Sequence, residues 1–154
     1  DYHRVRKIDS QGKVYRHAGT GSKGFSSDNV AATSSKLKNP AGLFIDRSGD
    51  LFIADQYNNR VRRVSSTSGK IYTVAGSGGE GHSGDNGPAT EAAFIRPGGA
   101  SMDSMGSLFI AVHGNHRIRE VTYGWTKIVI RKRKKLAATP TANSSFFFLD
   151  TFNL

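Results

Sequence analysis

The sequence predicts an all-β protein assembled from stacked repeats. The chain of 154 residues repeats itself at a fixed offset, so that residues 51–54 (Leu-Phe-Ile-Ala) recur as residues 108–111. Each repeat also contains short, strand-like segments separated by turn residues. Self-similarity at a fixed period of this length is typical of supersecondary units that stack on one another.

The register of the repeat extends beyond the strand segments. About half of the positions between residues 12 and 54 are identical, without a gap, to their partners between residues 69 and 111. The identical pairs include Gly12 and Gly69, Asp28 and Asp85, Pro40 and Pro97, Asp46 and Asp103, and Gly49 and Gly106. Glycine, proline and aspartate favour turns, so the turns are expected to recur together with the strands.

The best-preserved copy indicates four strands in order. They are expected at residues 42–46, 51–55, 60–64 and 70–74, and the segments between them are rich in Gly, Asn, Asp and Ser. Strands of about five residues that are joined by such turns form an antiparallel meander.

The composition of each strand predicts its position in the sheet. The second strand is apolar through residues 51–54, which predicts burial on both faces. The third strand, Arg-Val-Arg-Arg-Val at residues 60–64, suits a position nearer an exposed edge. Its apolar residues Val61 and Val64 lie three positions apart, which departs from strand alternation and would be reconciled by a β-bulge.

Four strands per repeat is the composition of one blade of a β-propeller. A single blade cannot bury both of its faces, so neighbouring blades must stack. A β-solenoid is the competing architecture, but its coils would be much shorter than the repeat of this chain. The expected fold is therefore a partial β-propeller of about two and a half four-stranded antiparallel blades.

Three strings in the sequence carry a family resemblance. FIADQYNNRVRRV (residues 52–64), TVAGSGGEGHSGDNGPATEA (residues 73–92) and LFIAVHGNHRIREV (residues 108–121) closely resemble NHL repeats, whose name reflects the Asn-His-Arg-Ile element at residues 115–118. The resemblance covers residues 1–128 and is closest to the variety with a long loop. It implies an NHL-type propeller, six-bladed when complete.

The chain departs from this pattern at identifiable places. The first long loop has Ser27, Val30 and Ala31 where the second has Gly84, Gly87 and Pro88, which predicts a different turn in the first loop. The third copy has Val112 in place of Asp55. After residue 128 the match ends, and we expect residues 129–154 to form a basic, disordered tail.

The tail accounts for much of the positive charge. The formal net charge is +10, and five of the basic residues lie in the run Arg-Lys-Arg-Lys-Lys at residues 131–135. Such a run is compatible with nuclear localisation or nucleic-acid binding. The repeat region itself is only mildly basic.

Several motifs that would indicate a cofactor or metal site are incomplete. Residues 76–81 fit G-x-G-x-x-G, but the following His-Ser-Gly-Asp-Asn-Gly-Pro cannot open the helix that a dinucleotide site requires. The acidic residues of the same loop lack the spacing of calcium loops. His113 and His116 lie on no expected helix face. We therefore expect no cofactor, no metal ion and no catalytic residues, so that the protein is not an enzyme.

Polar residues recur around the turn that joins the second and third strands. Asp55, Asn58 and Asn59 are expected to stabilise that turn. Arginines follow it in every copy and would align in rows across stacked blades: Arg4, Arg6, Arg60, Arg62, Arg117 and Arg119. The rows suit ion pairs between blades and a solvated face. The alternative is a basic stripe that contacts phosphate or an acidic protein surface.

The most economical functional hypothesis is a non-catalytic scaffold that mediates protein–protein interaction. The long loops at residues 19–39 and 76–96 are expected to emerge on one face, and Tyr57, His82, Asp85 and Glu91 are the candidate contact residues. One alternative is single-stranded RNA binding by a basic propeller face, with bases stacked on Tyr57 and weak contact through the tail. Another is a fragment of a propeller lyase.

The sequence also bears on assembly. The chain begins with Asp1 in the middle of a repeat, which we interpret as a fragment of a longer protein. Two and a half blades would leave apolar faces uncovered, so the chain should need further blades or self-association to close a propeller. The sequence contains no apolar run of membrane-spanning length and indicates no membrane partner.

Overall fold

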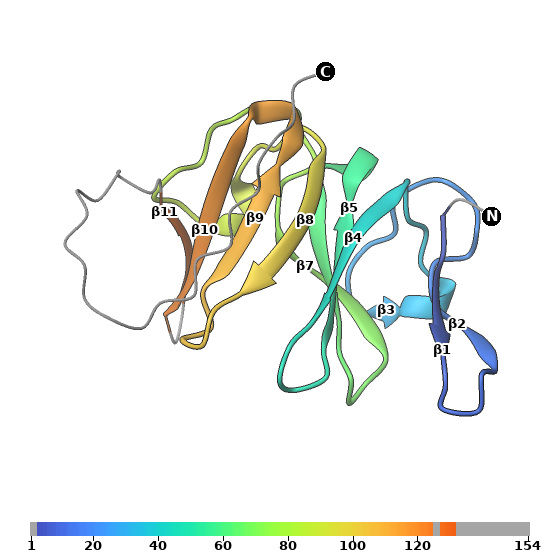
Figure 1. Ribbon diagram of the computed structural model, residues 1–154. Helices are drawn as coiled ribbons and strands as arrows, with labels where there is room; N and C mark the ends of the chain where they lie inside the picture. The colour runs from blue at the N-terminus through green and yellow to red at the C-terminus, as the bar shows by residue number, and fades with distance from the viewer. Residues whose placement is uncertain (1–2, 125–126, 132–154) are drawn as a thin grey trace, which may run out of the picture.

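The computed structural model describes residues 3–124 and 127–131 of the chain. Within these residues the secondary structure consists of β-strands and short 3-10 helices, without an α-helix. No helix in this part of the chain has the length and apolar character needed to cross a membrane. The strands form three antiparallel sheets that stand side by side (Figure 1). The all-β class expected from the sequence is therefore confirmed.

The first sheet is a hairpin of β1 (Val5–Ile8) and β2 (Val14–Ala18). The second sheet has the order β3-β7-β6-β5-β4. Its strands are β3 (Val30–Ala31), β4 (Pro40–Ile45), β5 (Leu51–Asp55), β6 (Arg60–Val64) and β7 (Lys70–Ala75). The third sheet has the order β11-β10-β9-β8. Its strands are β8 (Pro97–Met102), β9 (Leu108–Val112), β10 (Arg117–Gly124) and β11 (Lys127–Arg131).

The sheets follow the sequence repeat. Strands β4 and β5 have their counterparts one repeat later in β8 and β9. The first sheet corresponds to strands β6 and β7 of the second sheet. Strands β1 and β2 pair in the same register as β6 and β7, and both pairs show a register shift at the equivalent place. Each turn after a second strand is a short 3-10 helix, η2 (Gln56–Asn58) or η4 (His113–Asn115).

The Arg-rich third strand does not lie near a sheet edge, contrary to the sequence expectation. Strand β6 pairs with β5 on one side and with β7 on the other, and Arg62 is fully buried. The expectation was wrong because the carboxylates of Asp28 and Asp55 compensate the Arg62 charge. The expected bulge is confirmed, since the register of β6 against β7 shifts between Val61 and Arg62.

The two long loops share part of their path, but they differ at one of the positions where the sequence predicted different turns. Gly84 has a φ of 94°, in the left-handed region, whereas its counterpart Ser27 does not have positive φ. Asn29 and Asn86 both have positive φ, 68° and 66°, in the left-handed region that asparagine tolerates. Ala31 has a φ of −57°, close to the −59° of Pro88, so alanine takes the conformation to which proline is restricted. Equivalent 3-10 helices follow, η1 (Ala32–Ser34) and η3 (Ala89–Glu91).

Apolar side chains form two clusters, one at each junction between sheets. The first cluster joins the first two sheets through the loop at residues 19–39, and it contains Val5, Ala18, Ala32, Leu37, Leu51, Ile53, Val64 and Ile71. The second joins the second and third sheets, and it contains Phe52, Val61, Val74, Ala75, Ala89, Ala92, Phe94, Leu108, Ile110, Val112 and Val121. Strand β5 contributes to both clusters, which confirms that it is buried on both faces.

The outer sheets leave apolar side chains uncovered. Val61 is completely buried at the second junction, whereas its counterpart Ile118 in the third sheet is 66% exposed. Ile8 of the first sheet and Ile45 of the second are also largely exposed, where β1 and β4 border a cleft. Burial between the first and second sheets is thus incomplete beside β4, and the outward face of the third sheet is exposed at Ile118.

Strands β4 and β8, each at one edge of its sheet, approach each other closely. A Cβ atom on Gly42 would lie 2.6 Å from the carbonyl oxygen of Gly98 and 2.6 Å from the Cα atom of Gly99. These contacts are with backbone atoms, which cannot rotate away. Glycine at position 42 therefore sets the spacing between the two sheets.

We predict that Gly42→Ala lowers the free energy of unfolding by about 1–3 kcal/mol, because the methyl group must force β4 and β8 apart. Gly98→Ala is the matched control, since its Cβ would meet only atoms at 3.8 Å or beyond. It should change stability by less than about 0.5 kcal/mol. Urea unfolding of both variants checks this, and equal stabilities would contradict the close approach.

Candidate functional site

The long loops are attached to the sheets by a repeated set of backbone hydrogen bonds. The N–H of Gly19 donates to the carbonyl of Ala32 (2.9 Å), and the N–H of Gly76 donates to that of Ala89 (2.8 Å). The next residue in each loop makes a second matching bond, from Thr20 to Ser35 and from Ser77 to Ala92, both 2.8 Å. The loops are therefore ordered structures that begin identically in both copies.

A buried arginine in β6 holds the first long loop against the second sheet. Arg62 donates to the carbonyl of Ser26 (3.0 Å) and to the Asp28 carboxylate (3.2 Å), both in that loop. Its guanidinium also lies 3.7 Å from the carboxylate of Asp55, which ends β5. The Phe25 ring packs against the same guanidinium at 4.8 Å. Arg62 thus connects loop, sheet and turn.

Arg119 occupies the same place in the third sheet, one repeat later. Its guanidinium contacts the Asp85 carboxylate, the counterpart of Asp28, and lies within hydrogen-bonding distance of the carbonyls of His82 and Ser83. Arg119 is 2% exposed, and Phe94 lies 5.6 Å from its guanidinium. We refer to the pairs Arg62–Asp28 and Arg119–Asp85 as the loop clamps.

The electrostatics of the clamps follow from burial. Burial lowers the pKa of Arg62, and the charges of Asp28 and Asp55 oppose this shift. Burial likewise lowers the pKa of Arg119, opposed by Asp85. Because an arginine side chain remains protonated in proteins, the second and third sheets each contain a permanent buried cation. A buried charge is costly unless it is paired, so the loop carboxylates stabilise the fold.

Asp55 links the first clamp to the turn after β5. It accepts the N–H of Lys38 (2.7 Å) and the side-chain amide of Asn58 (2.8 Å), and that amide also donates to the carbonyl of Gly24 (2.7 Å). Burial raises the pKa of Asp55, whereas these hydrogen bonds and the charge of Arg62 lower it. Asp55 and Asn58 therefore hold the first loop at Gly24 and at Lys38.

In the third copy, the backbone N–H that Asp55 accepts in the second copy finds a different acceptor. Val112 stands where Asp55 does and cannot accept a hydrogen bond. The N–H of Ile95, the counterpart of Lys38, donates instead to the side-chain oxygen of Asn115 (2.9 Å). The backbone amide is thus satisfied, but Asp85 is the one carboxylate that pairs with Arg119 within the described residues.

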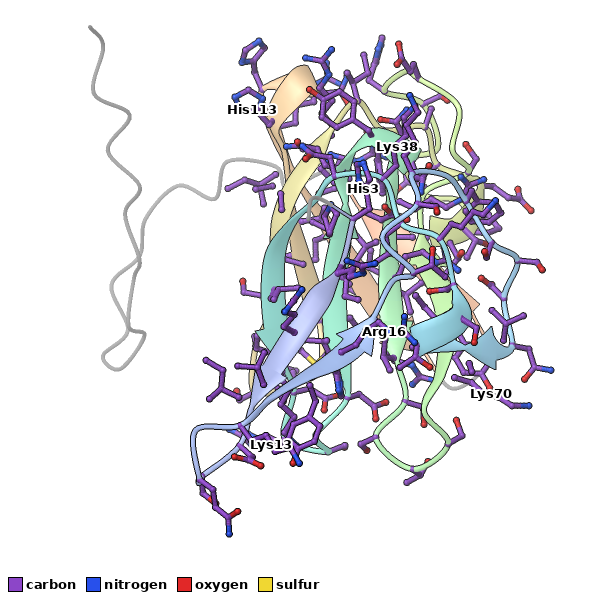
Figure 2. All side chains as sticks on the ribbon, turned by 90° about the vertical axis from the view of Figure 1, so that its right-hand side faces the viewer. His3, Lys13, Arg16, Lys38, Lys70 and His113 are labelled. Carbon is purple, nitrogen blue, oxygen red and sulfur yellow. The ribbon has the colours of Figure 1, made fainter. Side chains whose placement is uncertain are left out.

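A second polar contact joins each sheet to the start of the next. The Nδ1 atom of His3 accepts the N–H of Asn39 (3.0 Å), and the side-chain oxygen of Asn59 accepts the N–H of Arg96 (3.0 Å). Asn39 and Arg96 directly precede strands β4 and β8. Figure 2 shows His3 and Lys38 near the same end of the molecule. These contacts define the joints between sheets.

The six recurring arginines do not form a continuous exposed stripe. Arg62 and Arg119 are buried in the clamps. Arg4 donates twice to the carbonyl of Thr20, at 3.0 and 2.8 Å, and Arg60 donates to the carbonyls of Asn58 and Ser77. Arg6 and Arg117 are exposed. Most of this positive charge therefore serves to hold loops in place.

The predicted contact residues lie in different surroundings. Tyr57 is 42% exposed in η2, and the Arg96 guanidinium lies over its ring at 5.1 Å. His82 and Glu91 are exposed on the loop at residues 76–96. Asp85 is engaged with Arg119. The His82 carbonyl and the Asp85 carboxylate both lie near the Arg119 guanidinium. Tyr57 lies beside Arg96, the last residue of the loop at residues 76–96.

Sequence reasoning did not identify the acidic partners of the clamps. Asp28 and Asp85 were visible as an identical pair in the repeat, and Arg62 and Arg119 are related by the same offset. Because the two aspartates and the two arginines recur at the same offset, the sequence contained a signal that could have predicted an Asp–Arg ion pair in each copy. In the described part of the chain, three or more His, Cys, Asp or Glu side chains do not gather in an arrangement suited to a metal ion.

No protein-family model matches the chain, but three curated proteins are similar to part of it. They are human teneurin-1 (31% identical over 103 residues), human NHL repeat-containing protein 2 (31% over 86) and the chloroplastic protein SUPPRESSOR OF QUENCHING 1 of Arabidopsis thaliana (27% over 85). The matches cover 59%, 54% and 55% of this chain. They span only 4%, 12% and 8% of the relatives.

Solved structures resemble the fold more completely. A protein of unknown function from Bacteroides thetaiotaomicron superimposes with a TM-score of 0.66 at 23% identity, over 83% of this chain and 30% of that one. An auxiliary nutrient binding protein from the same organism gives a TM-score of 0.61 at 23% identity, over 85% and 33%. The chain is thus a distant homologue of an NHL repeat-containing protein with a β-propeller-like fold.

The two clamps should respond differently to loss of the loop carboxylate. We predict that Asp85→Asn lowers the free energy of unfolding by about 1–3 kcal/mol, because Arg119 then loses a partly buried ionic partner. Asp28→Asn should cost about 0.5–1 kcal/mol, since Arg62 retains Asp55. Urea unfolding of the two variants measures the difference. Equal losses would show that Asp55 does not share the charge of Arg62.

Proposed function

We propose that the chain is part of a six-bladed, NHL-type β-propeller that acts as a non-catalytic scaffold for protein binding. Its three sheets would form two complete blades and the outer half of a third. The observation that carries the proposal is the repeated loop clamp, which fixes one long loop on each complete blade. Loops held on a rigid frame are common carriers of recognition.

The NHL assignment is supported by residues and by relatives. The Asn-His-Arg-Ile element lies at the η4 turn, where the side chain of Asn115 accepts the N–H of Ile95. Similarity to human NHL repeat-containing protein 2 supports the same family. The number of blades in a closed ring is part of the proposal and rests on the family resemblance.

The chemistry of the charged residues favours binding over catalysis. The buried groups Arg62, Asp55 and Arg119 each contact an oppositely charged partner, and these contacts join loop to sheet. The charges of Arg62, Asp55 and Arg119 are thus used in ion pairs that stabilise the fold. The exposed polar residues His82 and Glu91 lie on the loop surface, which suits contact with another protein. This arrangement supports a scaffold over a propeller lyase.

The same geometry disfavours RNA binding by a basic propeller face. Two of the six recurring arginines are buried, and Arg4 and Arg60 bind loop carbonyls. The ring of Tyr57, the candidate for base stacking, is partly covered by Arg96. The basic run at residues 131–135, apart from Arg131, lies outside the described residues. Any RNA affinity is therefore expected to depend on the tail and on salt.

A selection experiment tests the scaffold proposal against the RNA alternative. We expect a random peptide library displayed on phage to yield peptides that bind the immobilised chain. His82→Ala with Glu91→Ala should weaken binding of the selected peptides about thirtyfold in calorimetry, because two contacts of about 1 kcal/mol each are lost. Lys13→Ala, in the hairpin turn of the first sheet, is the control and should leave their affinity unchanged.

The RNA arm uses a fluorescein-labelled oligouridine and a mixed-sequence RNA of equal length. Residues 129–131, which the sequence assigned to the tail, belong to β11, so the shortened chain ends at residue 131. For this chain we expect no difference between the two RNAs at physiological salt. Sequence-selective binding by this shortened chain, together with failure to enrich any peptide, would overturn the scaffold proposal in favour of RNA recognition.

A further inference from the structure

The first long loop carries an exposed aromatic ring beside two exposed lysines. The ring centre of Phe25 lies 4.0 Å from the guanidinium carbon of Arg60 and 4.8 Å from that of Arg62, yet 44% of the residue remains exposed. Lys23 and Lys36 of the same loop are exposed as well. Exposed aromatic residues are enriched where proteins bind one another, so this part of the loop is suited to a partner.

Contacts within the loop bring the three side chains together. Lys23 pairs with Leu37 in a parallel β-bridge, and the N–H of Gly24 donates to the Leu37 carbonyl (3.2 Å). The stem of Lys36 lies over Gly24, because a Cβ atom on that glycine would be 3.1 Å from the Lys36 Cδ atom. Lys36 therefore lies against the residue that separates Lys23 from Phe25.

The fold does not use the charge of either lysine. Within the described residues, the ammonium groups of Lys23 and Lys36 form no ion pair and no hydrogen bond. Asp28 is the one carboxylate of the loop at residues 19–39, and it is bound by Arg62 and Thr73. Carboxylates of another molecule can therefore pair with both lysines.

The second long loop provides an internal comparison. The residues of the loop clamps are identical in the two copies, as Asp28 and Asp85 show. The three exposed positions of the first loop differ, since Lys23, Phe25 and Lys36 correspond to Glu80, His82 and Ala93. The second loop is clamped without a basic and aromatic surface, so this surface is not needed to fix a loop on its sheet.

We propose that Lys23, Phe25 and Lys36, which we call the Phe25 patch, bind a short acidic segment of a partner protein that carries an aromatic residue. Carboxylates of the segment pair with the two ammonium groups, and its aromatic ring packs against Phe25. The inference rests on the proposed scaffold function and adds the chemistry of one partner.

The charge of the neighbouring loop favours a short peptide over a nucleic acid. Arg60 links the two loops, because its guanidinium lies over the Phe25 ring and donates to the carbonyl of Ser77. The loop that begins there contains three acidic residues and one arginine: Glu80, Asp85, Glu91 and Arg96. A long polyanion that crossed the Phe25 patch would be repelled on that side, whereas a short acidic segment avoids the second loop.

A peptide titration on the full chain tests the proposal. The probe is a fluorescein-labelled heptapeptide, Asp-Glu-Asp-Trp-Asp-Glu-Asp, whose palindromic sequence presents carboxylates on both sides of the ring. We expect saturable binding in fluorescence anisotropy at physiological salt. Ala in place of the Trp should weaken binding about five- to tenfold, because the contact with Phe25 is lost. On a Phe25→Ala chain the two peptides should bind equally.

Charge reversal tests where the peptide binds. Lys23→Glu with Lys36→Glu should weaken binding about tenfold or more, because each ion pair becomes a like-charge contact. Lys13→Glu with Arg16→Glu is the matched control, since it makes the same change in net charge on the first sheet. Figure 2 shows Lys13 at the opposite end of the molecule from Lys38 of the first loop. The control should change the affinity by about twofold at most, because salt screens distant charges.

Two results would overturn the proposal. One is absence of saturation at millimolar peptide, or equal weakening by the two charge-reversed variants, which would assign binding to net charge and to the basic run at residues 131–135. The other is tighter binding of an oligouridine of equal charge that Lys23→Glu with Lys36→Glu abolishes, which would assign the Phe25 patch to RNA. If the acidic peptide fails while His82→Ala with Glu91→Ala still weakens the phage-selected peptides, the patch is wrong and the scaffold function stands.

Discussion

The structure depends on the burial of one face of each sheet by the neighbouring sheet. A sheet of four short strands exposes two surfaces, and the apolar clusters of this chain lie at the two junctions where such surfaces meet. The requirement explains why β5 is apolar at successive positions, since Leu51 and Ile53 enter one cluster and Phe52 enters the other. It also explains the exposure of Ile118, whose sheet has a neighbour on one side only among the described residues.

Close stacking requires the long connections between sheets to be fixed, and this is the role of the loop clamps. Each loop supplies a carboxylate and backbone carbonyls to an arginine inside the sheet, so the loop cannot leave without exposing a buried charge. The third copy shows that the arrangement tolerates change. Val112 removes one acceptor, and Asn115 accepts the freed backbone N–H. The clamps therefore fix the two long loops against the second and third sheets.

The sequence predicted the elements that are governed by local pattern. The period, four of the five strands of the second sheet and the bulge beside Val61 follow from the spacing of apolar and turn residues. It did not predict the interior position of β6, because an Arg-rich strand indicates an edge unless its partners are known. Those partners, Asp28 and Asp55, are brought to Arg62 by the tertiary fold. The part of the path that the two loops share, at Asn29 and Ala31, was also missed, since it depends on Ala31 adopting a φ that its identity does not impose.

Native-state hydrogen exchange tests the central claim that the sheets and their joints form one cooperative structure. The informative amides are those of Asn39, which donates to His3, and Arg96, which donates to Asn59. The account predicts that both exchange with an opening free energy within about 1 kcal/mol of that for the most protected amides of β5. Rapid exchange of Asn39 and Arg96 while β5 remains protected would show that the sheets open independently, and would contradict the account.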